Sequence, residues 1–191
     1  MDNRMILIEG YLASGKSTFA EQLSRQIQVP CLVKDTFKIA LCSNIQVADR
    51  KEKSRFSAVT FDGMMYVAER MLGAGYPIIL EGNFVPAGVK ERDESEAIRQ
   101  LAGRCHAAVL TYKFIGDTKV LYQRFVAREE TVGRGDVTRI GSAVAFSEFH
   151  KWCHNLDPFF AGGEVIQVDT TDFDRVDWDG LTDAAREFLG R

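Results

Sequence analysis

The sequence predicts a single α/β domain in which helices cover both faces of a parallel β-sheet. Five short runs of apolar, β-branched-rich residues alternate along the chain with segments of helical periodicity. This alternation is typical of a three-layer sandwich with the sheet in the middle. The chain has 191 residues, of which 46% are hydrophobic, enough for one sizeable core. We therefore expect one domain over residues 1–191.

The apolar runs place the expected strands at residues 5–9, 30–34, 77–81, 107–114 and 164–168. Between the first two strands, one apolar stripe at helical spacing is formed by Phe19, Ala20, Leu23 and Ile27. A longer helix is expected over residues 57–72 and is stopped by Gly73, Gly75 and Pro77; its inward residues are Phe61, Met64, Met65, Ala68, Met71 and Leu72.

The remaining helices are expected in the second half of the chain. Residues 90–101 are charged on most faces, so they predict a surface helix. Asp117 is placed to cap a helix over residues 118–130. Two more helices are expected at residues 144–154 and 180–189.

A glycine-rich loop joins the first expected strand to the first expected helix. Residues 10–17 read Gly-Tyr-Leu-Ala-Ser-Gly-Lys-Ser, the complete P-loop pattern. Backbone N–H groups can converge on phosphate oxygens only where side chains do not obstruct them, which explains Gly10 and Gly15. The following helix adds its unpaired N–H groups and the positive end of its dipole. The loop therefore predicts a nucleotide-binding site.

Each polar residue of this loop has an expected task. Lys16 is expected to bridge the β- and γ-phosphates, and the Ser17 hydroxyl to coordinate Mg²⁺. Thr18 supplies a second hydroxyl on the first helical turn. The expected nucleotide-binding residues of this segment are Gly10, Ala13, Ser14, Gly15, Lys16, Ser17 and Thr18.

Two carboxylates follow neighbouring strands at the edge of the sheet that carries the P-loop. Asp35 follows the second strand and Glu81 ends the third. We assign Asp35 the role of base, which orients the attacking hydroxyl and accepts its proton, and Glu81 the role of magnesium ligand. The alternatives are that Asp35 caps a helix starting near Thr36 and that Glu81 is a solvated carboxylate. Which of the two is the base stays open.

Three arginines lie on or after the helix at residues 118–130. Arg124 and Arg128 fall within the sector of that helix that also holds its apolar residues, and Arg134 lies in the glycine-rich segment 131–141. We predict that they bind the nucleotide or stabilise the transferring phosphoryl group, with Arg128 and Arg134 acting in catalysis. The alternative for Arg124 or Arg128 is pairing with Glu129, Glu130 or the end of the helix. Thr170, after the last strand, is expected to approach adenine through its backbone.

Together these features resemble the small P-loop kinases, a group that includes nucleoside monophosphate kinases, shikimate and gluconate kinases, chloramphenicol phosphotransferase and zeta-toxin-like proteins. The resemblance implies the P-loop NTP hydrolase fold with strand order 2-3-1-4-5 and an arginine-bearing lid, here an insertion at about residues 128–141. It also implies ATP and Mg²⁺ as cofactors. Glu81 departs from the pattern, since many relatives have Asp followed by Gly at that point.

The predicted function is ATP-dependent transfer of the γ-phosphate to a hydroxyl of a small-molecule acceptor. The acceptor pocket is expected between Asp35, the basic stretch 50–55 and the aromatic residues Phe146, Phe149 and Trp152, although that stretch also suits a solvated face. The alternatives are an ATPase or switch that regulates a protein partner, and a polynucleotide 5′-kinase.

Composition narrows these classes further. The net charge of -3 and pI near 5.7 give no sign of a nucleic-acid partner or of an anionic membrane. No apolar stretch approaches the roughly 20 residues of a membrane span. The four cysteines are scattered singly, as is typical of thiols in a reducing compartment. We therefore expect a cytoplasmic protein.

Overall fold

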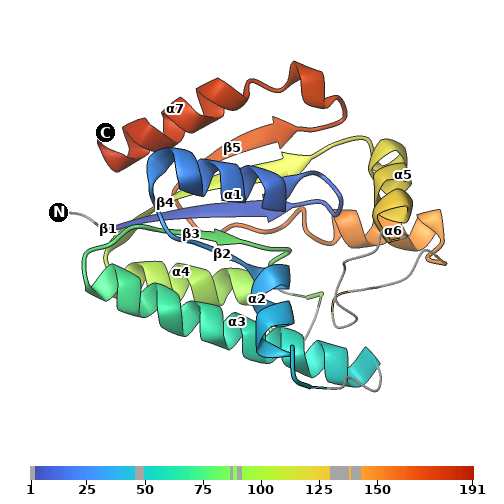
Figure 1. Cartoon of the computed structure of the whole chain (residues 1–191), viewed down its shortest axis with the longest axis horizontal. Coiled ribbons are helices and arrows are strands. Elements are labelled where there is room, and N and C mark those ends of the chain that lie inside the picture. Colours follow the sequence, from blue (N-terminus) through green and yellow to red (C-terminus); the bar gives the residue numbers. More distant parts are fainter. Residues whose placement is uncertain (1–2, 46–49, 87, 90–91, 130–137, 139–142) are drawn as a thin grey trace.

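The structure is a computed structural model. It describes residues 3–45, 50–86, 88–89, 92–129, 138 and 143–191 (Figure 1). Within these residues, no helix combines the length and the apolar character needed to cross a membrane.

Five parallel strands form one sheet in the order β2-β3-β1-β4-β5. The strands are β1 (Asn3–Gly10), β2 (Cys31–Val33), β3 (Ile78–Glu81), β4 (Ala107–Ile115) and β5 (Glu164–Asp169). Both the α/β class and the strand order are confirmed. Because all strands run the same way, their carboxyl ends, and the loops that follow them, meet along one edge.

Helices cover both faces of this sheet and complete the three layers (Figure 1). One face carries α1 (Lys16–Ile27) and α7 (Trp178–Leu189), and the other carries α3 (Arg50–Gly73) and α4 (Glu94–Arg104). Successive side chains of a strand point to opposite faces. Accordingly Ile6 of β1 packs in the core beneath α1 and α7, and Leu7 packs in the core beneath α3 and α4.

Three helices differ from the sequence-based expectation, and one of them, α3, begins at Arg50 and not at residue 57. α4 buries Ile98, Leu101 and Ala102 in the core, so it packs on the sheet and is not merely a surface helix. α2 (Lys34–Leu41) begins directly after β2, which puts Asp35 inside its first turn. The N-cap of α2 is Val33, so the alternative that Asp35 is a helix cap is wrong.

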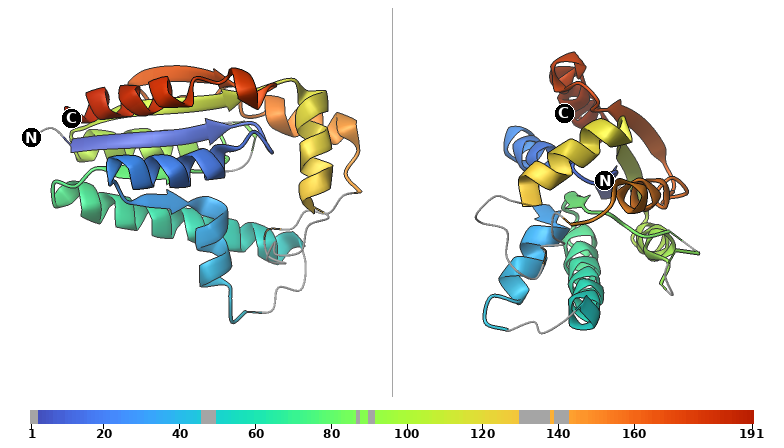
Figure 2. Two further views of the ribbon diagram at one scale, coloured as in Figure 1. Left: turned by 45° about the horizontal axis from the view of Figure 1, so that its top comes forward. Right: turned by 90° about the vertical axis from the view of Figure 1, so that its right-hand side faces the viewer.

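Two further helices stand beyond the carboxyl ends of the strands, where Figure 2 shows them as a pair. They are α5 (Thr118–Glu129) and α6 (Phe146–His154). Asp117 caps α5 as expected, because its Oδ1 accepts hydrogen bonds from the N–H groups of Lys119 and Val120 at 2.8 and 3.2 Å. Together with α2 and the start of α3, these helices surround the sheet edge that carries the P-loop.

Candidate active site

A cavity of about 1310 Å³ lies at the carboxyl edge of the sheet. It is lined by the P-loop, the start of α2, the first turns of α3, the end of β3, and parts of α5 and α6. The sites that we predicted at separate points of the chain therefore share one space. Among the residues that the structure describes, the predicted residues lining this space are Ala13, Ser14, Gly15, Lys16, Ser17, Thr18, Asp35, Glu81, Arg124 and Arg128.

The P-loop is fixed by close backbone contacts. Gly10 has a φ of +122°, and a Cβ added there would lie 2.0 Å from the Phe114 carbonyl oxygen. The Tyr11 N–H donates to the same oxygen at 2.8 Å. Asn83 Nδ2 donates to the Gly10 carbonyl at 2.7 Å, a support that sequence reasoning missed because it comes from a loop after β3. The Tyr11 hydroxyl donates to Asp157 Oδ1 at 2.7 Å. Because of its positive φ and its close approach to the Phe114 carbonyl oxygen, position 10 requires glycine.

Lys16 is the buried cation of this loop. The residue is 5% exposed, and Nζ donates to the Tyr11 carbonyl oxygen at 2.5 Å. Burial lowers the pKa of Lys16, whereas the nearby charges of Glu81 and Glu9 act in the opposite direction. A buried ammonium beside converging N–H groups suits an anion with several oxygens, such as a polyphosphate.

Glu81 lies at the end of β3, next to the start of α1. Its Oε1 accepts a hydrogen bond from the Ser17 hydroxyl at 3.2 Å. Glu81 is 3% exposed, so the alternative that it is a solvated carboxylate is wrong. Burial raises the pKa of Glu81 to about 7, against the opposing effect of Lys16. The pair offers one hydroxyl and one carboxylate oxygen, the hard ligands that Mg²⁺ prefers in sites completed by phosphates and water.

Arg128 lies close to both predicted carboxylates. Burial lowers its pKa, and the nearby charges of Asp35 and Glu81 oppose that shift. Asp35 itself is exposed to the cavity at the first turn of α2. The structure thus brings a cation and two carboxylates to the place where the P-loop and α2 meet.

Arg124 contacts the loop that follows β5. Its two terminal nitrogens donate to the carbonyl oxygens of Thr170 and Thr171 at 2.6 and 2.9 Å, and its guanidinium lies 4.0 Å from the centre of the Phe173 ring. The Phe173 ring stands 6.2 Å from that of Trp178, centre to centre. Sequence reasoning missed Phe173, because an aromatic residue in a polar loop forms no motif.

Two predicted residues that the structure describes, Gly10 and Thr170, do not line the cavity. The Thr170 hydroxyl is buried and donates to the Ile115 carbonyl at 3.0 Å, so only its backbone remains available for the predicted role. Arg134 and most of the predicted lid at 128–141 lie outside the described residues.

The expected acceptor pocket is only partly assembled as predicted. Lys53 and Ser54 of the basic stretch line the cavity, and so does Trp152 of α6. Phe146 and Phe149 instead pack against the Tyr122 ring, at 5.5 Å between ring centres in each case. Those two aromatic residues hold α6 against α5, because their helical spacing turns them toward that helix.

Several solved structures share this fold. A "putative kinase" from Chloroflexus aurantiacus is 22% identical with a TM-score of 0.83, covering 100% of this chain and 98% of that one. A shikimate kinase from Aquifex aeolicus is 16% identical with a TM-score of 0.59 (98% and 99% covered). A gluconokinase from Sinorhizobium meliloti is 14% identical with a TM-score of 0.57 (98% and 92% covered).

Sequence comparison gives the family directly. No curated protein matches the chain. The profile of the AAA domain family matches residues 5–145, which include the P-loop, both predicted carboxylates and both described arginines. The chain therefore belongs to the AAA domain family, and it has the fold of the small P-loop kinases.

Proposed function

We propose that this protein is an ATP-dependent kinase that transfers the γ-phosphate to a hydroxyl group of a small-molecule acceptor. One observation carries the proposal: Lys16, Glu81 and Asp35 line a single cavity that continues from the P-loop along α2 and α3. Its volume of about 1310 Å³ exceeds the roughly 300–1,000 Å³ typical of a site for one small ligand. The cavity can therefore admit a second molecule beside the nucleotide.

The P-loop end of the cavity would hold the nucleotide. The backbone N–H groups of residues 10–17 and the Lys16 ammonium would bind the phosphates, and Arg124 and Phe173 flank the loop proposed to approach adenine. Ser17 and Glu81 would hold Mg²⁺, which when bound neutralises charge on the phosphates. The proposal retains one domain over residues 1–191, in which the predicted lid at about 128–141 would bring Arg134 to this end of the cavity.

In the proposed transfer, the acceptor hydroxyl oxygen attacks the γ-phosphorus. The new O–P bond forms while the bond between that phosphorus and the β,γ-bridging oxygen breaks, and ADP leaves. The hydroxyl proton passes to Asp35, which lines the cavity at the first turn of α2. Lys16 and Arg128 stabilise the charge on the phosphoryl oxygens.

The two alternative functions, a regulatory switch or ATPase and a polynucleotide 5′-kinase, explain this cavity less well. A switch or ATPase that regulates a protein partner has no need of room for a second molecule beside Asp35. A polynucleotide 5′-kinase would require a basic groove leading to the site, whereas the net charge of the chain is -3.

The test separates nucleotide binding from transfer. Lys16→Ala is expected to abolish ATP binding, measured by calorimetry with Mg²⁺. Asp35→Asn is expected to bind ATP normally and to lower transfer from labelled ATP to a panel of hydroxyl compounds by about 100-fold or more. Asp179→Asn, an exposed carboxylate on α7, is the matched control and should leave both unchanged. Full transfer by Asp35→Asn would overturn its role as the base.

A further inference from the structure

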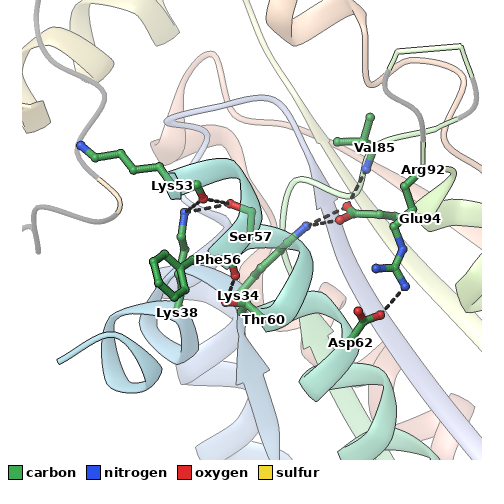
Figure 3. A network of polar contacts seen from close by, with 10 residues as sticks. All are labelled: Lys34, Lys38, Lys53, Phe56, Ser57, Thr60, Asp62, Val85, Arg92 and Glu94. Carbon is green, nitrogen blue, oxygen red and sulfur yellow. Dashed lines mark hydrogen bonds and ion pairs between the residues drawn. The ribbon is translucent and has the colours of Figure 1, made fainter. Parts of the chain in front are cut away.

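Lys38 is a buried cation at the end of the cavity away from the P-loop. It lies on α2, the residue is 6% exposed, and it lines the cavity together with Lys53 and Ser57 of α3. Figure 3 shows its ammonium directed at α3, where Nζ donates to the Lys53 carbonyl oxygen and to the Ser57 hydroxyl, each at 2.8 Å. Both of these partners are neutral.

The neighbouring Lys34 provides a contrast on the same helix. Its Nζ donates to both carboxylate oxygens of Glu94 at 2.7 Å, and Glu94 also accepts the Val85 N–H at 2.9 Å (Figure 3). The charge of Lys34 is therefore balanced by a carboxylate in direct contact. Lys38 has no such ion pair within the described part of the chain, where its third N–H hydrogen also has no acceptor.

The other charged groups near Lys38 are Asp35 and Lys34 of α2 and Lys53 of α3. Burial lowers the pKa of Lys38; Asp35 and then Cys42 oppose that shift, whereas Lys34 and Lys53 add to it. Asp35 is also the proposed base, and Glu94 is occupied by Lys34. Burying an ammonium is unfavourable unless an anion or several strong acceptors accompany it. An anionic ligand would supply the missing charge.

We infer that the acceptor carries an oxyanion, a carboxylate or a phosphate, which binds Lys38 Nζ beside the Ser57 hydroxyl. This inference rests on the proposed kinase function and deepens it. Asp35 and Lys38 are three residues apart on α2, so their side chains share one face, with Cβ atoms about 5–6 Å apart. The reactive hydroxyl at Asp35 and the oxyanion at Lys38 would consequently be separated by only a few bonds.

The first experiment measures acceptor preference with the full chain. Hydroxy acids, phosphorylated polyols and their neutral amides or unphosphorylated parents are compared as acceptors of labelled phosphate from ATP. We expect the anionic compounds to be preferred by about 10–100-fold in kcat/KM, the effect of one charge-assisted hydrogen bond. Comparing the carboxylates with the phosphates identifies the kind of oxyanion. Equal use of neutral and anionic acceptors would overturn the inference and leave the kinase function standing.

The second experiment assigns the preference to Lys38. Lys38→Gln is expected to raise KM for the anionic acceptor by about 10-fold or more, with little change in kcat, in KM for ATP or in KM for the neutral parent. Lys38→Arg keeps the charge and should restore most of the discrimination. Lys151→Gln, on the exposed side of α6, is the matched control. Equal losses for neutral and anionic acceptors with Lys38→Gln would contradict the assignment.

A binding measurement separates this inference from the kinase proposal. The same oxyanion compounds are added to wild type and to Lys38→Gln, and the shift in melting temperature is recorded without ATP. Stabilisation of wild type alone, with no phosphoryl transfer to any compound, would support the oxyanion site and overturn the kinase function. Equal shifts in both proteins would count against the site whether or not transfer occurs.

Discussion

Backbone groups form one end of the cavity, and side chains form the other. At the P-loop end, consecutive residues present backbone N–H groups, and the loop is held by the backbone of β4 at Gly10 and by Asn83. At the other end, side chains of α2 and α3 meet through Lys38 and its contacts. Backbone geometry leaves little room for change, whereas side chains can be exchanged singly. If the proposed function holds, nucleotide binding and acceptor choice can therefore change separately.

The largest expected effect is at Gly10. Gly10→Ala places a methyl group 2.0 Å from the Phe114 carbonyl oxygen, so either β1 or β4 must move. We expect a loss of about 3 kcal/mol in the free energy of unfolding and loss of ATP binding. Urea denaturation and calorimetry measure the two. Gly103→Ala, at a helical position with nothing within 4 Å of the added Cβ, should be neutral or slightly stabilising. If Gly10→Ala and Gly103→Ala have similar free energies of unfolding and similar ATP affinities, the P-loop end is not rigid.

A smaller effect is expected where α2 meets α4. Glu94→Gln removes the carboxylate that receives Lys34, in a pair whose side chains are 12% and 9% exposed. We expect about 2 kcal/mol of destabilisation in urea, because a buried cation loses its counter-charge. The control Glu96→Gln breaks the exposed pair with Arg99 and should leave the urea midpoint nearly unchanged. If Glu94→Gln changes the free energy of nucleotide binding by as much as the free energy of unfolding, the two ends of the cavity cannot change separately.

A third effect, which depends on pH, concerns Glu9, below the P-loop in β1. Within the described residues neither of its carboxylate oxygens has a hydrogen-bond partner, and burial raises its pKa to about 7. The folded protein therefore keeps this proton between about pH 4.5 and 7, where the unfolded chain has lost it. Stability should fall as pH rises through this window.

The matching variant is Glu9→Gln, which cannot ionise. Between pH 4.5 and 7 its stability relative to wild type should rise by roughly 1.4 kcal/mol per pH unit, and the difference should vanish below pH 4.5. Thermal denaturation across this pH range measures the difference. Glu187→Gln replaces an exposed glutamate on α7 and should show the same dependence of stability on pH as wild type. A difference between Glu9→Gln and wild type that does not depend on pH would show that ionisation is not the cause.

The sequence predicted the P-loop end better than the acceptor end, for a physical reason. Phosphate binding depends on the conformation of consecutive residues, so Gly10, Lys16 and Ser17 could be recognised from spacing alone. Strand order followed from the resemblance that those residues carry. Asp35 and Glu81 were found because parallel strands end at a common edge.

The missed features depend on how helices are placed in space. Lys38 contacts Ser57 only because α2 lies against α3, and no periodicity in the chain specifies that packing. The contact of Arg124 with Phe173 likewise joins α5 to the loop after β5. Phe146 and Phe149 were placed in the acceptor pocket because the orientation of a short helix cannot be inferred from its composition.

The positions of Trp152 and Trp178 have an optical consequence. They are the two tryptophans of the chain, one lining the cavity and the other next to Phe173, the ring beneath Arg124. Indole emission responds to its surroundings, so replacing either tryptophan with Phe leaves a single fluorophore. The Trp178 signal would follow events at the nucleotide end, and the Trp152 signal events in the cavity near α6. The chain thus already contains two spectroscopic probes, and the order in which its ligands arrive can be timed without attaching a dye.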